Sequence, residues 1–122
     1  MFESIVDGFV EALLWSSHSD EDESRDFTDL GPHDLSSHGL AAVYRLVGEF
    51  VTDWRITPIL HDLDCKPEQI GHDLALTVNG HGVGFNDREF YTHLQKCLLD
   101  KVASTLGPVE PFVNSDNLID VE

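Results

Sequence analysis

The sequence predicts an α+β fold in which three helices pack on a small antiparallel sheet made of two β-hairpins. Apolar residues recur at helical spacing in three segments, Asn79-Gly80 is a strong hairpin-turn signal, and the last residues read as two short strands around a turn. The length of 122 residues fits one domain covering 1–122. A hydrophobic content of 41% is sufficient for a core without disulfides or metals.

The first helix is expected over residues 2–15, where large apolar side chains recur three and four positions apart. A solvated acidic loop follows at about residues 16–36. Its main carboxylates are Asp20, Glu21, Asp22, Glu23, Asp26 and Asp29.

The second helix is expected to begin after a cap at Ser36 or Ser37 and to run to about Trp54. Pro58 interrupts the next segment, residues 56–66, whose structure the pattern leaves open. Pro67 then suits the first position of one short helical turn, which Gly71 closes.

The first hairpin is expected over residues 72–85, with Asn79-Gly80 as its two-residue turn. In that register Leu74, Leu76 and Val78 share an apolar face, because alternate residues of a strand point the same way. The opposite face carries small residues and is open to close approach by a ligand or another backbone.

The third helix is expected to start at a cap on Asn86, with Glu89 three residues later, and to stop at Gly107-Pro108. Cys97 lies among apolar neighbours on this helix and is interpreted as a buried thiol.

The second hairpin is expected from a strand at 109–113, a turn at 114–117 and a strand at 118–121. Pro111 indicates that its strand lies at an edge or a bulge, since proline cannot donate a backbone hydrogen bond.

Charge is the dominant feature of the composition. The chain has 23 Asp and Glu and only 7 Lys and Arg, which gives a net charge of −16. Such a chain repels phosphate backbones and anionic membranes, so direct binding to either is not expected. Solubility, adaptation to high salt, and mimicry of nucleic acid all remain open as explanations. Each is compatible with attraction to a basic partner.

No cofactor or metal site is expected. Cys65 and Cys97 are not in Cys-x-x-Cys spacing, and the segment from His61 to Cys65 has no second ligand pair that would close a zinc site. The N-terminus has no basic signal-peptide region, and no apolar run approaches the length of a membrane span, which favours the cytoplasm.

Residues 71–88 carry a distinctive pattern: Gly-His-Asp at 71–73, Thr-x-Asn-Gly-His-Gly-x-Gly-Phe at 77–85, and Asp-Arg at 87–88. The chain resembles small acidic proteins encoded by phages and prophages, whose function is not established, and the likeness covers most of its length. Those proteins usually carry an aromatic pair where this chain has Leu74-Ala75, and a basic residue where it has Val78. The resemblance implies a phage origin and a fold, and for a phage protein the expected cytoplasm is that of the infected host. It implies no mechanism.

The first hairpin also holds the candidate ligand-binding residues, which are polar side chains beside glycines. A ligand site competes here with ordinary turn and cap chemistry. The register also places His72 opposite Asp87, a pair that could act in acid–base catalysis or simply hydrogen-bond. The residues are His72, Asp73, Thr77, Asn79, His81 and Asp87.

The favoured function is that of a non-enzymatic phage accessory protein. It would bind and inhibit or modulate a host protein with a basic surface, such as a DNA-handling or defence enzyme, through the carboxylates at 20–29. One alternative is a small-ligand-binding protein or enzyme with its site at His72, Asp73 and His81. Another is a phage structural protein. The oligomeric state is left open, with a homodimer as one alternative.

Overall fold

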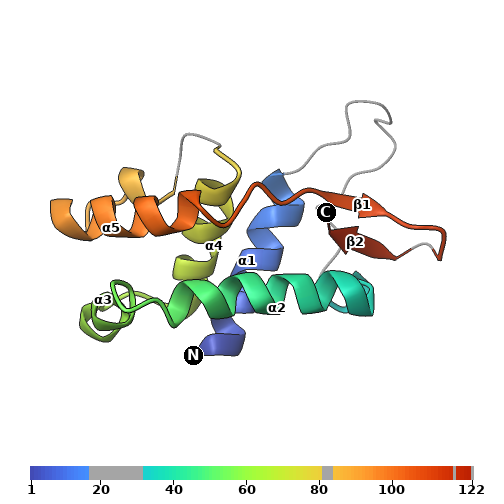
Figure 1. Ribbon diagram of the computed structural model, residues 1–122, viewed down its shortest axis with the longest axis horizontal. Helices are drawn as coiled ribbons and strands as arrows, with labels where there is room; N and C mark the ends of the chain where they lie inside the picture. Colours follow the sequence, from blue (N-terminus) through green and yellow to red (C-terminus); the bar gives the residue numbers. More distant parts are fainter. Residues whose placement is uncertain (17–31, 81–83, 117, 122) are drawn as a thin grey trace.

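The computed structural model describes residues 1–16, 32–80, 84–116 and 118–121. Within these ranges the chain forms five α-helices, two 3₁₀ turns and one antiparallel pair of strands (Figure 1). This arrangement is α+β, as predicted, but it is richer in helix and poorer in sheet. The elements are α1 (Phe2–Ser16), η2 (Pro32–Asp34), α2 (Ser37–Val51), α3 (Thr57–Asp62), α4 (Pro67–Val78), η3 (Phe85–Asp87), α5 (His93–Ser104), β1 (Pro111–Val113) and β2 (Ile119–Val121). None of the described helices combines the length and the apolar character that crossing a membrane requires.

The centre of the fold is the pair α1 and α4, which lie side by side behind α2 (Figure 1). The two helices touch backbone to backbone at Gly8 and Gly71. A Cβ at Gly8 would collide with the carbonyl oxygen of Glu68, and a Cβ at Gly71 would collide with that of Ile5. Small residues are therefore needed on both sides of this crossing, and α1 follows the predicted helix 2–15 closely.

The start of α2 was predicted correctly. The Ser36 side chain accepts a hydrogen bond from the Gly39 N–H at 2.9 Å, as an N-cap residue does. The Ser36 N–H in turn donates to the Ile119 carbonyl at 2.7 Å, which joins the helix start to the C-terminal strand. At the far end, Phe50 is fully buried and its ring lies 5.7 Å from that of Phe85.

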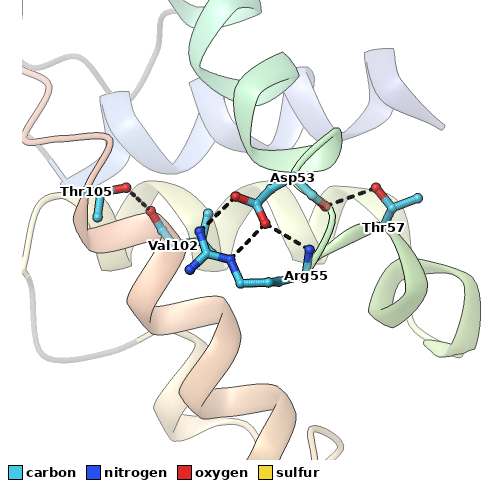
Figure 2. A network of polar contacts seen from close by, with 5 residues as sticks. All are labelled: Asp53, Arg55, Thr57, Val102 and Thr105. Carbon is cyan, nitrogen blue, oxygen red and sulfur yellow. Dashed lines mark hydrogen bonds and ion pairs between the residues drawn. The ribbon is translucent and has the colours of Figure 1, made fainter.

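The corner between α2 and α3 is held by a local ion pair (Figure 2). The Asp53 carboxylate accepts hydrogen bonds from both the backbone and the guanidinium of Arg55, at 2.9–3.0 Å. These bonds lower the pKa of Asp53 from its ordinary value, with the guanidinium as the largest cause. The Asp53 carbonyl accepts a further bond from the Thr57 hydroxyl at 3.1 Å.

The C-terminal hairpin was also predicted correctly. β1 and β2 pair antiparallel with Pro111 opposite Val121 and Val113 opposite Ile119. Leu35 forms an isolated parallel bridge to Ile119, so β2 has neighbours on both sides whereas β1 is an edge strand. Pro111 lies in that edge strand, as expected.

The predicted first hairpin was wrong: residues 67–78 form the continuous helix α4, which does not stop at Gly71. Asn79 is the C-cap of this helix, and Gly80, with φ of 67°, is the residue after it. A left-handed glycine ends helices as readily as it makes tight hairpin turns, so the Asn-Gly signal fits both. Most of α4 is buried, which removes the polar stripe that distinguishes an amphipathic helix from a strand.

The predicted start of the third long helix was wrong as well. Asn86 lies in η3, and α5 begins at His93. Thr92 and Gln95 form a reciprocal capping box, in which each side chain accepts a hydrogen bond from the other residue's backbone N–H. This start places Cys97 on the exposed side of α5, so the expectation of a buried thiol was incorrect.

Candidate functional site

Asp73 is the most unusual ionisable residue described, because its side chain is fully buried within α4. Three side-chain donors surround its carboxylate. Arg88 Nε and Gln69 Nε2 donate to Oδ1 at 2.9 and 3.0 Å, and the Tyr91 hydroxyl donates to Oδ2 at 2.9 Å. A buried carboxylate is tolerated only when it is paired and hydrogen-bonded in this way.

Two of these donors come from the segment that follows α4, so the Asp73 network holds residues 84–92 against that helix. The Phe85 N–H donates to the Thr77 hydroxyl at 3.3 Å, and a Cβ at Gly84 would collide with the same hydroxyl. The Asn79 side chain accepts a bond from the Val109 N–H at 2.7 Å, which ties the end of α4 to the approach to β1. Asp73, Thr77 and Asn79 therefore each hold a neighbouring segment of the fold in place.

Among the described candidates, neither His72 nor Asp87 contributes a hydrogen bond or an ion pair to the Asp73 carboxylate. His72 lies on the half-exposed side of α4, where its Nε2 is 3.4 Å from a carboxylate oxygen of Glu11 in α1. Asp87 is exposed in η3. His81 lies outside the described residues, so its place relative to His72 and Asp73 stays a prediction.

Burial and the Asp73 carboxylate also act on two neighbouring groups. The pKa of Tyr91 is strongly raised, first by burial and then by the negative charge of Asp73, so its hydroxyl stays protonated as a donor. Burial is likewise the largest cause that raises the pKa of the Cys65 thiol, followed by Asp73.

Alkaline pH should therefore destabilise the protein through Tyr91. Its pKa is higher in the folded state than the value of about 10 for an unfolded tyrosine, so the stabilisation is complete below pH 10 and falls as the pH rises. We expect Tyr91→Phe to cost about 1 kcal/mol at pH 7, the value of a hydrogen bond. Between pH 8 and pH 11 the free energy of unfolding should fall in both proteins, and we expect the fall to be about 1 kcal/mol smaller in Tyr91→Phe than in wild type. Urea unfolding at pH 8 and pH 11 tests this. An equal fall in the free energy of unfolding of the two proteins would contradict it.

An acidic face follows one side of α1. Glu3, Asp7 and Glu11 recur every four residues, are exposed, and share the helix with no Lys or Arg. Glu68 of α4 is exposed too, and its backbone touches α1 at Gly8. In the described part of the chain, arginine and lysine pair with carboxylates only at Arg55–Asp53 and Arg88–Asp73, so this face is not neutralised by them.

The predicted partner-binding carboxylates, Asp20, Glu21, Asp22, Glu23, Asp26 and Asp29, all lie outside the described residues. The apolar spacing of residues 2–15 predicts the helix but does not by itself indicate an acidic face on α1. The complementary positions of the same helix carry the signal: acids at every fourth residue mark its solvent side.

No protein-family model, curated protein or solved structure matches the chain.

Proposed function

We propose that the chain is a non-enzymatic phage accessory protein that binds a host protein through its acidic surface. The target has a basic surface of the kind that DNA-handling and defence enzymes use to hold nucleic acid. Binding would be steered by charge and would inhibit or modulate the target by covering that surface.

The observation that carries the proposal is the row of Glu3, Asp7 and Glu11 on α1. Like charges four residues apart on a helix repel one another, at a cost of a few tenths of a kcal/mol per pair. Solubility alone requires net charge but not this ordering, since the same charges spread over the surface would avoid the cost.

The spacing of these carboxylates also suits a nucleic-acid-binding groove. Positions four residues apart on a helix are about 6 Å apart along its axis, so the three carboxylates present a regular row of negative charge to such a groove. The acids at 20–29 follow α1 in sequence and add six carboxylates to the negative charge of the chain. The overall charge of −16 attracts a basic partner over a distance as well.

The test is affinity capture from host lysate at physiological salt, with mass spectrometry of the captured proteins. Wild type is compared with Glu3→Gln/Asp7→Asn/Glu11→Gln and with Asp20→Asn/Glu21→Gln/Asp22→Asn/Glu23→Gln. We expect the α1 variant to weaken capture about tenfold, because three exposed contacts of about 0.5 kcal/mol each are lost. Capture by wild type should also weaken as salt is raised.

The matched control is Glu49→Gln/Glu110→Gln/Asp116→Asn, which removes three exposed charges from α2 and from the segments around the C-terminal hairpin. It should retain the partner. If the control and the α1 variant lost capture of the partner equally, the effect would depend on net charge and not on the α1 face. If wild type captured no basic protein, the proposal would be refuted. A captured nuclease should then be inhibited in competition with its DNA substrate.

A further inference from the structure

The outward face of α5 carries a histidine and a cysteine, two residue types that can bind metal ions, and neither belongs to the acidic face of α1. His93 and Cys97 are four residues apart, both are exposed, and His93 Nε2 lies 3.8 Å from Cys97 Sγ. Residues at this spacing project from the same side of a helix, one turn apart. Leu99, Val102 and Ala103 form the buried side of α5, so the histidine and the cysteine face away from the core.

The separation of the two atoms matches the spacing of two ligands on one zinc ion. Zinc binds imidazole nitrogen at about 2.0–2.1 Å and thiolate sulfur at about 2.3 Å, so a tetrahedral angle sets the two atoms about 3.6 Å apart. The observed 3.8 Å requires only a small opening of that angle. We propose that His93 and Cys97 chelate Zn²⁺, and that the same pair from a second copy of the chain completes a Cys₂His₂ site.

A second copy is needed because one chain supplies too few ligands. In the ranges that the structure describes, no group of three or more His, Cys, Asp and Glu side chains could hold a metal ion. Structural zinc takes four protein ligands. Two α5 helices related by a two-fold axis provide two nitrogens and two sulfurs, and each thiol loses its proton to solvent as it binds.

The surroundings of the pair favour the approach of two copies at this helix. Among the described α-helices, α5 alone has more Lys and Arg than Asp and Glu, with Lys96 and Lys101 against Asp100. Charge repulsion between two chains of −16 is therefore lower here than at the other described α-helices. Leu94 is 68% exposed beside the pair and supplies apolar contact area. The helix also lies at the end of the molecule opposite the β1–β2 hairpin (Figure 1).

The experiment uses the full chain with its thiols kept reduced by a phosphine. Cobalt(II) replaces zinc as a spectroscopic probe, because a cobalt–thiolate bond gives a charge-transfer absorption that nitrogen and oxygen ligands do not. We expect titration to saturate at about half an equivalent of Co²⁺ per chain, two chains sharing one four-ligand ion. Sedimentation should show a dimer with Zn²⁺ and a monomer with EDTA.

His93→Ala and Cys97→Ser should each lower metal affinity at least tenfold and abolish the zinc-dependent dimer. The controls are His61→Ala and Cys65→Ala, which remove the same two residue types elsewhere and should bind metal like wild type. Helical circular dichroism confirms that each variant is folded. The proposal is overturned by an absent charge-transfer band in wild type, an unchanged band in Cys97→Ser, or one Co²⁺ per monomeric chain.

Discussion

Replacing Arg88 with methionine is expected to lower the free energy of unfolding by about 3 kcal/mol. The change removes the guanidinium that pairs with Asp73, whose side chain is 0% exposed, and leaves a carboxylate in the core without this counter-charge. Removing one partner of a buried ion pair typically costs about 3–5 kcal/mol. The lower end applies because the Arg88 side chain is itself 36% exposed, so some water can replace it.

A double-mutant cycle separates the ion pair from the loss of packing. In Asp73→Asn/Arg88→Met the buried group is neutral, so the double variant should be more stable than Arg88→Met alone. The measurement is urea unfolding followed by circular dichroism, and Arg45→Met on the exposed side of α2 is the control. That control should change stability by about 0.5 kcal/mol or less. Additive effects of the two core changes, or a loss below about 1 kcal/mol for Arg88→Met, would contradict the proposed role.

The Asp73 network explains why part of the fold could be predicted from sequence and part could not. Local signals worked where the interactions are local: the Ser36 cap lies three residues from Gly39, and the C-terminal strands flank a short turn. Asp73 and Tyr91 are 18 residues apart and meet only once α4 has formed and the following segment has folded back over it. The periodicity of apolar residues in the sequence does not predict that this segment folds back over α4.

The candidate site shows the same division. The pattern at 71–88 was interpreted as a candidate ligand site, yet Asp73 and Thr77 bind other parts of the chain. The histidine and cysteine of α5 were missed because the helix was expected to start at Asn86, with Cys97 among its buried residues. The signal that would have corrected this was the Thr92-x-x-Gln95 capping box. It fixes the start of the helix independently of its apolar side chains.

Gly71→Ala is expected to destabilise the protein by about 3 kcal/mol or more, although alanine is the better helix former. A methyl group at position 71 would collide with the Ile5 carbonyl oxygen and come within 2.6 Å of the Phe9 backbone nitrogen. Backbone atoms cannot rotate away as a side chain can, so α1 and α4 must move apart across the centre of the core. Overpacking of this kind commonly costs about 1–3 kcal/mol, and more where the surroundings are rigid.

Gly48→Ala makes the same chemical change where the surroundings do not resist it. Gly48 lies inside α2, and a Cβ there would meet no atom within 4 Å. Only the higher helix propensity of alanine then affects stability, so the free energy of unfolding of Gly48→Ala should be higher than that of wild type by about 0.5–1 kcal/mol. Thermal unfolding of the two variants should therefore shift the melting temperature in opposite directions. Equal shifts would mean that the α1–α4 contact at Gly71 is looser than its geometry indicates, because helix propensity alone predicts stabilisation at both positions.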